Sequence, residues 1–279
     1  MARVRPAVLL STVIAWGLAV VWALPFIGLV MVSLRPYSEV LIKGWWSIGG
    51  AHFTLENFKD AWSNPMYSVE RGYINSLIVT IPSTIAPILI AALAAYAFSR
   101  FSFPLKNYLF ITLLVIMSMP QQMSVIPLFF MLKELHLLDR LAGLILVHSS
   151  WGLAWITFFL KNFFDSLPRE MEEAARVDGA GELQIFLRIV LPASLPALAS
   201  VAAIQFTWVW SDFFYALMFL ISPENYVVTL QVGTMKGQYH LDWGLLSAGS
   251  IFAMLVPLLL YAGLQKYYVR GMIGWTAKG

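Results

Sequence analysis

The stretch RGYINSLIVTIPSTIAPILIAALAAYAFSR, residues 71–100, contains no Asp, Glu, Lys or Arg between its two terminal arginines. A helix needs about 20 apolar residues to cross a bilayer, so this stretch predicts a transmembrane helix. Five such uncharged stretches of 20 to 29 residues occur, and a sixth, 189–223, is interrupted only by Asp212. We therefore expect an all-α integral membrane protein whose single domain, 1–279, has six transmembrane helices. The predicted spans are 8–33, 74–98, 107–131, 141–161, 196–221 and 244–265.

The composition agrees with a membrane protein and excludes several kinds of site. Hydrophobic residues make up 59% of the chain and charged residues 12%, against roughly 25% charged in a soluble domain. The absence of cysteine excludes disulfides, zinc–thiolate sites and thiol nucleophiles. Neither a P-loop nor an HExxH motif occurs, so we expect no enzyme activity and no cofactor in this chain. The basic residues are not clustered, which argues against nucleic-acid binding.

Basic residues indicate which side of the membrane each loop faces. The N-terminus, 99–106, 161–195 and the tail after 265 together hold eleven Lys and Arg, and the remaining loops hold seven. The positive-inside rule places the first set in the cytoplasm, so both termini are expected there. The uncharged run in 8–33 is about twice as long as a signal-peptide core and is predicted to be a retained helix. The outside segments are then 34–73, 132–140 and 222–243.

A few polar residues lie within the predicted spans. Gln121 and Gln122 adjoin Pro120, which would interrupt helical hydrogen bonding. They could line a polar translocation pathway, although prolines are common in membrane helices in any case. Asp212 is the one acid that we place at membrane depth, and we count no partner base within the spans. It is expected to face protein or water, as an interhelical hydrogen-bond partner or as a wall of the pathway.

Segment 165–195 has the composition of two short helices joined by a tight turn. Ser166 could cap the first helix and Pro168 suits its first turn. Gly179 and Gly181 can end that helix in a left-handed conformation. A second helix is expected over 182–190. The predicted product is a cytoplasmic two-helix projection between the fourth and fifth spans.

The order of residues in this segment resembles the EAA loop of binding-protein-dependent ABC importers: Glu-Ala-Ala, three residues, Gly, nine residues, Ile-x-Leu-Pro. Further segments, such as Asn75-Ser76-Leu77 and Trp210-Ser211-Asp212-Phe213, resemble carbohydrate-type permeases of the maltose-permease group, in particular the smaller of two unlike subunits. The resemblance implies contact with an ATPase at Glu173, Ala174, Ala175, Asp178, Gly179, Ile189, Leu191 and Pro192.

The resemblance also implies the rest of the assembly. It predicts a second, unlike permease, two copies of an ABC ATPase that bind ATP and Mg, an extracellular solute-binding protein, and a bacterial cytoplasmic (inner) membrane. The solute would be a sugar or oligosaccharide, with a polyol or glycerol-phosphate-like solute still open. An ion-coupled secondary transporter or channel is the competing interpretation, because six helices do not exclude it. The residues expected to contact the binding protein are Gly233, Gly237 and Tyr239.

Overall fold

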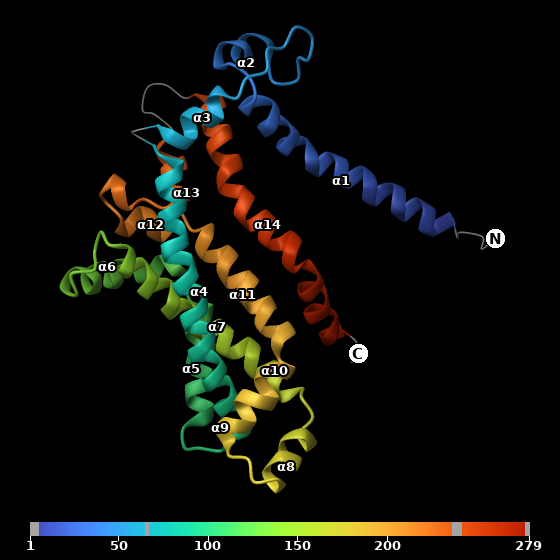
Figure 1. Ribbon diagram of the computed structural model, residues 1–279, viewed down its shortest axis with the longest axis vertical. Helices are drawn as coiled ribbons and strands as arrows, with labels where there is room; N and C mark the ends of the chain where they lie inside the picture. Colours follow the sequence, from blue (N-terminus) through green and yellow to red (C-terminus); the bar gives the residue numbers. More distant parts are fainter. Residues whose placement is uncertain (1–5, 65–66, 236–241, 277–279) are drawn as a thin grey trace. The chain divides into compact units, whose positions relative to one another are not determined.

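The computed structural model describes residues 6–64, 67–235 and 242–276, and every regular element in these ranges is a helix (Figure 1). The predicted all-α class is therefore confirmed. The chain divides into two compact units. The first comprises Met1–Glu70 and Gln231–Met254, and the second comprises Arg71–Leu230 and Leu255–Gly279.

The first unit contains α1 (Pro6–Ser33), α2 (Tyr37–Lys43), α3 (Glu56–Ser63) and the first part of α14 (Trp243–Thr276). Only 6% of the apolar window of α1 is buried inside the chain. Its apolar side chains consequently point outward along most of the helix, as expected for a helix surrounded by lipid or by another subunit.

Two buried polar side chains hold the connection that follows α1 through hydrogen bonds to backbone carbonyls. Arg35 is fully buried, and its Nη1 donates hydrogen bonds to the carbonyls of Gly44 (3.0 Å) and Ser47 (2.8 Å). Asn57 Nδ2 donates to the carbonyls of Ser33 and Arg35, both at 2.9 Å. The buried side chains of Arg35 and Asn57 thus satisfy backbone carbonyls that no helix engages and hold this partly exposed connection in place.

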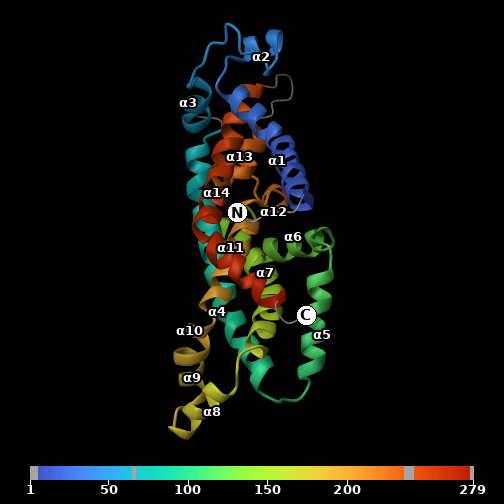
Figure 2. The ribbon, with the colours of Figure 1, turned by 90° about the vertical axis from the view of Figure 1, so that its right-hand side faces the viewer.

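The second unit contains most of the remaining helices and the part of α14 from Leu255 onward, while the first two residues of α4 and the part of α13 from Gln231 onward belong to the first unit. Figures 1 and 2 show α4, α7 and α11 running beside one another within the second unit. The elements are α4 (Val69–Arg100), α5 (Lys106–Ser118), η1 (Gln121–Ser124), α6 (Val125–Glu134), α7 (Leu141–Asp165), α8 (Glu170–Val177), α9 (Glu182–Ile185), η2 (Phe186–Val190), α10 (Leu191–Ala193), α11 (Leu195–Trp210), α12 (Phe214–Phe219), η3 (Pro223–Asn225) and α13 (Val228–Thr234).

Four of the described helices, α1, α4, α7 and α14, are long and apolar enough to cross a membrane. Two bent pairs raise the number to six if each pair is one span: Lys106–Ser118 with Gln121–Glu134, bent by 100°, and Glu182–Ala193 with Leu195–Trp210, bent by 74°. The first bend interrupts the predicted span 107–131, whereas the second lies at Ser194, just before the predicted span 196–221. That span is interrupted elsewhere, between the end of α11 at Trp210 and the start of α12 at Phe214.

Local chemistry explains both interruptions. The third predicted span breaks at Met119, whose backbone is extended before Pro120, because proline disfavours the helical conformation in the residue that precedes it. The fifth ends as a helix at Trp210 and resumes at Phe214. Asp212 lies in this gap, and its carboxylate accepts backbone N–H groups at the start of α12, which favours a new helix start over continuation.

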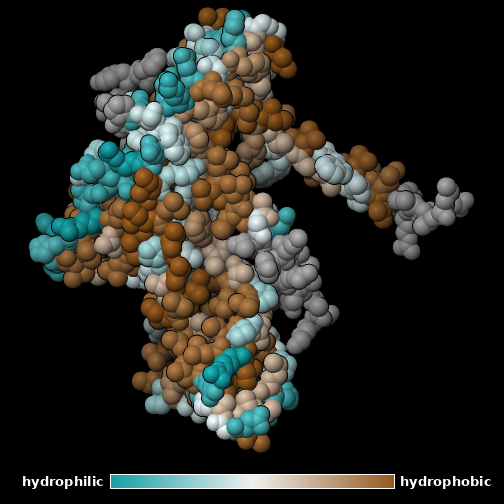
Figure 3. Space-filling view, in the orientation of Figure 1, coloured by the Kyte–Doolittle hydropathy of each residue, from teal (hydrophilic) through white to brown (hydrophobic). Residues whose placement is uncertain are grey.

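The packing core of the second unit joins α4 and α7 to the helices of segment 165–195. Small residues on α4 are fully buried there, in agreement with the close helix approach that such residues permit. Figure 3 shows apolar surface over the long helices of this unit and hydrophilic side chains gathered around α8. The buried members of this core include Ala91, Ala95, Ile156, Leu160, Phe164, Ile185, Phe186 and Val190.

Candidate functional site

Helix α8 lies at the same end of the second unit as the connection between α4 and α5 (Figures 1 and 2). A buried ion pair fixes it there. Arg100, the last residue of α4, approaches Glu172 Oε1 with Nη2 at 2.7 Å and donates to it from Nε at 2.8 Å. The two side chains are only 4% and 3% exposed. A charge-assisted hydrogen bond from Nε, with a second guanidinium nitrogen close to the same oxygen and little access to water, gives this contact a defined geometry.

A second carboxylate ties α8 to α9. Arg176 Nε donates to Glu182 Oε1 at 2.7 Å, and Tyr96 of α4 donates from its hydroxyl to Glu182 Oε2 at 2.9 Å. The hydrogen bond from Arg176 lowers the pKa of Glu182 below its ordinary value. Helix α8 is therefore attached both to the end of α4 and to the helix that follows it.

The turn after α8 is a Schellman motif closed by Gly179, whose φ is +84°. The amide of Ala180 donates to the carbonyl of Ala175 at 2.9 Å, and the amide of Gly179 donates to the carbonyl of Arg176 at 3.0 Å. A side chain is disfavoured at this left-handed φ. The expected role of Gly179 as a helix stop is present, whereas Gly181 has an ordinary φ of −76°.

The residues expected to contact an ATPase fall into two groups. Those that the structure leaves exposed are Glu173, Ala174, Asp178, Gly179 and Pro192. The half-buried ones pack against the core of the second unit, and they are Ala175, Ile189 and Leu191.

One sequence expectation about segment 165–195 needs correction, and one buried residue was not singled out. Ser166 does not cap α8; it ends α7, and its hydroxyl donates to the carbonyl of Phe163 at 2.7 Å. Helix α8 begins later, at Glu170, with no side-chain cap. The sequence reasoning also missed Glu172 in favour of its neighbour Glu173. Arg100, a charge at the very end of a predicted span, was the signal that a buried acid was needed.

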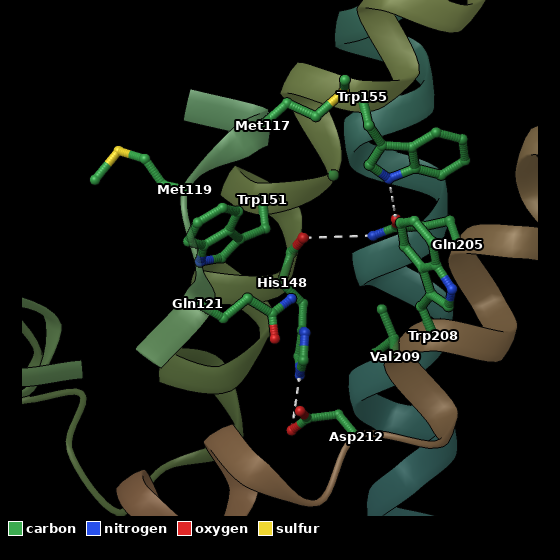
Figure 4. Close-up of a pocket in the computed structure, with 11 residues that line it drawn as sticks. Met117, Met119, Gln121, His148, Trp151, Trp155, Gln205, Trp208, Val209 and Asp212 are labelled. Carbon is green, nitrogen blue, oxygen red and sulfur yellow. Dashed lines mark hydrogen bonds and ion pairs between the residues drawn. The ribbon is translucent and has the colours of Figure 1, made fainter. Parts of the chain in front are cut away.

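A cavity of about 540 Å³ lies in the second unit, where the break between α5 and η1 and the gap between α11 and α12 meet the continuous helix α7 (Figure 4). Side chains from the α5–η1 break, α7, α11 and the α11–α12 gap surround it. The lining residues are Met117, Met119, Gln121, His148, Trp151, Gly152, Trp155, Gln205, Trp208, Val209 and Asp212.

Asp212 has a basic neighbour that the sequence analysis did not count. His148 Nε2, from α7, lies 3.6 Å from Asp212 Oδ2. The same carboxylate accepts the backbone N–H groups of Tyr215 (3.4 Å) and Ala216 (3.1 Å). The expectation that no partner base lies within the spans was therefore wrong, since His148 falls inside the predicted span 141–161. Asp212 both begins α12 and lines the cavity.

Gln205 holds one wall of the cavity in place. Its Oε1 accepts the indole N–H of Trp155 at 2.9 Å, and its Nε2 donates to the carbonyls of Ser83 (3.0 Å) and His148 (3.3 Å). A Cβ at Gly152 would lie 2.7 Å from Gln205 Nε2, so glycine is what permits this close approach. The buried amide is fully engaged, and the orientation of the Trp155 ring is fixed.

The remaining residues predicted for the translocation pathway and for the binding-protein contact do not all lie at the cavity. Gln121 lines the cavity together with Asp212, whereas its neighbour Gln122 is not among the lining residues. Gly233 is an exposed residue near the end of α13. Gly237 and Tyr239 lie outside the described residues.

At the opposite end of the second unit from α8, Asp139 fastens the loop after α12. Its carboxylate accepts the amide N–H of Ile221 (2.8 Å) and both the amide (3.0 Å) and hydroxyl (2.5 Å) of Ser222. Partial burial raises the pKa of Asp139, but the hydrogen bonds from Ser222, Ile221 and Asn225 outweigh it and lower the pKa to about 2. Asp139 therefore holds the connection after α6 and the connection after α12 together.

Comparison with known proteins identifies a family and several relatives that this chain resembles. The profile of the family described as "Binding-protein-dependent transport system inner membrane component" matches residues 65–274. A probable ABC transporter permease protein of Pyrococcus horikoshii is 54% identical over 97% of this chain and 98% of the relative. An osmoprotective compounds uptake permease protein of Synechocystis is 38% identical over 94% and 89%. An alpha-glucoside transport system permease protein of Rhizobium meliloti is 38% identical over 81% and 61%.

One solved structure shares the fold. A chain of a bacterial ABC transporter involved in the import of the acidic polysaccharide alginate superposes with a TM-score of 0.77. The superposition covers 96% of this chain and 100% of that chain, at 19% sequence identity.

Proposed function

The chain belongs to the family of inner membrane components of binding-protein-dependent transport systems, and on this premise we propose that it is a permease subunit of an ATP-driven ABC importer for a sugar or oligosaccharide. The observation that carries the proposal is the family match, which includes α8 and its exposed residues. Family membership also disfavours the competing interpretation as an ion-coupled transporter or channel.

Helix α8 is the proposed contact for the ATPase. Its exposed face offers the small side chain of Ala174 beside the acid Glu173, and the exposed Gly179 in the turn that follows has no side chain to obstruct contact. Its opposite side is held to α4 by the buried pair of Glu172 with Arg100. A helix attached in this way transmits a displacement to α4 as a unit, which suits ATP-driven switching between two packings of the permease.

The solute assignment rests on the relatives. The relative from Rhizobium meliloti is described for alpha-glucosides and the one from Synechocystis for osmoprotective compounds. We favour a sugar or oligosaccharide because its hydroxyls suit the polar and aromatic lining of the cavity. Gln121 and Asp212 are the proposed wall of the translocation pathway, since intramembrane acids commonly mark such pathways.

The proposed assembly contains a second, unlike permease, two ATPase subunits that bind ATP and Mg, and an extracellular binding protein that docks near Gly233. Both termini lie in the cytoplasm, together with α8. The buried pair of Arg100 with Glu172 and the carboxylate contacts of Asp139 join loops that the basic-residue count assigns to the same side, which supports this arrangement.

Affinity purification followed by reconstitution tests the proposal. The tagged chain should bring down an ATPase with a P-loop and a second permease. Proteoliposomes that contain this complex and its binding protein should accumulate labelled sugar only when ATP is enclosed with the ATPase. Accumulation driven by a proton or sodium gradient, without ATP, would establish an ion-coupled transporter instead.

A further inference from the structure

We propose that the cavity between α7, α11 and the two helix breaks is a subsite for one neutral pyranose ring of the transported solute, an inference that rests on the proposed function. Its volume of about 540 Å³ lies within the range of roughly 300–1,000 Å³ that is common for small-molecule sites. The subsite lies within this chain, so this subunit contacts the solute itself.

Aromatic rings supply the stacking surface. The rings of Trp155 and Trp208 have centroids 5.2 Å apart and planes inclined by 58°, so they form a corner at one wall of the cavity. Trp151 adds a third indole from the preceding turn of α7 (Figure 4). The C–H faces of a pyranose ring pack on the negative faces of such rings. Because Gln205 fixes the Trp155 indole, this surface is formed before the solute arrives.

Polar groups face this aromatic corner from the other walls. The side-chain amide of Gln121 projects toward the cavity, while its backbone carbonyl is engaged by the hydroxyls of Ser124 and Tyr215 (Figure 4). The amide therefore offers both a donor and an acceptor to sugar hydroxyls. Asp212 offers carboxylate oxygens that accept such hydroxyls, because its present donors leave lone pairs over.

The charges of the lining select against anionic solutes. Asp212 is the acid of the site, His148 faces it at 3.6 Å, and none of the lining residues is Lys or Arg. A phosphate or uronate would bring a second negative charge beside this carboxylate without a fixed cation to pair with it, which is costly in a low-dielectric setting. The geometry therefore favours an uncharged sugar and argues against a glycerol phosphate.

The position of the cavity agrees with a solute site. It is bounded by two interrupted helices, and unwound backbone at membrane depth is found where it lines a cavity or lies inside protein. Transporter substrate sites are commonly built at such discontinuous helices. Here the break before η1 presents Gln121, and the gap before α12 presents Asp212. Both breaks thus bring a polar side chain to the same space.

The test uses the complete importer in proteoliposomes, with its ATPase, second permease and binding protein. Radiolabelled maltose, trehalose and melibiose are the neutral probes, and glucuronate and glycerol 3-phosphate are the anionic comparators. The readouts are sugar molecules imported per ATP hydrolysed and the stimulation of ATPase activity by the loaded binding protein. The variants are Gln121→Leu and Trp208→Ala. Gln122→Leu, beside Gln121 but outside the lining, and Trp16→Ala, on the exposed side of α1, are the matched controls.

We expect Gln121→Leu to lower import per ATP about threefold to tenfold, as loss of a hydrogen bond to a hydroxyl does. Trp208→Ala should lower it about tenfold through loss of stacking. ATPase stimulation should stay within about twofold, and both controls should behave as wild type. Wild-type import by both variants, or preferred import of an anionic comparator, would overturn the subsite. So would loss of the second permease from the purified Trp208→Ala complex, because the cavity would then be a subunit contact. A wild-type complex that imports no neutral sugar with ATP would instead refute the proposed function.

Discussion

The guanidinium of Arg100 and the carboxylate of Glu172 lie 2.7 Å apart although 72 positions separate them in the chain. Arg100 ends a long apolar helix, and Glu172 lies in a short polar one. Because both side chains are buried, neither can exchange its partner for water. This pair is therefore the buried ionic contact that holds α8 to the end of α4, beside the contacts of Glu182 with Arg176 and Tyr96.

Glu172→Gln should separate α8 from α4. Breaking a buried pair by removing one charge costs roughly 3–5 kcal/mol, so we expect a lower unfolding temperature of the purified complex and poor coupling of ATP hydrolysis to uptake. Glu173→Gln is the matched control because this neighbouring side chain is exposed, and an exposed pair contributes only about 0–1 kcal/mol. Equal stability of the two variants would contradict the role assigned to the pair.

Gly179→Ala should destabilise the turn after α8, and Gly181→Ala should not. Neither Cβ would meet another atom within 4 Å, so the two variants differ only in the backbone. The φ of +84° at Gly179 makes a side chain cost roughly 1–2 kcal/mol. Thermal unfolding of the two variants, compared with wild type in the same detergent, measures this difference. The larger Gly179→Asp should also abolish uptake if this turn contacts the ATPase.

Ala174→Trp should block attachment of the ATPase without unfolding α8. Ala174 is exposed, whereas Ala175 is half-buried against the core of the second unit. Overpacking at Ala175 is expected to cost roughly 1–3 kcal/mol, so Ala175→Trp should lower the unfolding temperature as well as uptake. Co-purification of the ATPase with each variant, measured beside its unfolding temperature, separates the two effects. Normal uptake by Ala174→Trp would mean that this face of α8 does not dock.

Asp139→Asn should loosen the loop after α12. The folded-state pKa of about 2 is below the ordinary value of 3.8, so the carboxylate stabilises the fold above about pH 4 and loses this contribution as the pH falls toward 2. At pH 7 the variant should lose about 1–3 kcal/mol, as expected for hydrogen bonds to a charged acceptor. Unfolding temperatures of variant and wild type should therefore converge between pH 4 and pH 2. The exposed Asp178→Asn serves as the control at pH 7.

Single cysteines test the orientation, because the chain has none of its own. Glu224→Cys should react with a membrane-impermeant thiol reagent in intact cells, since the basic-residue count places 222–243 outside. Ser102→Cys, in the exposed connection between α4 and α5, should react only after the membrane is permeabilised. The reverse pattern would invert the proposed topology.

The sequence was sufficient for features that depend on composition and local propensity. Uncharged stretches located every helix long enough to cross a membrane, and glycine spacing located the turn at Gly179. The helix break at Pro120 lies where the proline predicts a kink, although a bend of 100° depends on tertiary packing that no local pattern specifies. The gap at Asp212 was missed because hydropathy averages over a short interruption.

Contacts between residues far apart in the chain could not be predicted from the sequence. Nothing in the spacing of Arg100 and Glu172 indicates that they meet, and two adjacent glutamates look alike until one is buried. His148 was not counted as a partner base of Asp212 because no local pattern places it near that acid. Gln121 and Gln122 could not be told apart for the same reason, since the break before η1 decides which of them lines the cavity.

The carbonyl of Asp212 accepts the hydroxyl of Thr229 at 2.5 Å, and its carboxylate accepts two amides of α12. A single residue thus lines the cavity, accepts hydrogen bonds from the start of α12, and is bonded to Thr229 of α13. Any shift of Asp212 when a solute enters or leaves must be passed on to Thr229 or must break that bond. One hydrogen bond therefore joins a residue that lines the cavity to helix α13, at the other end of a connection of 16 residues.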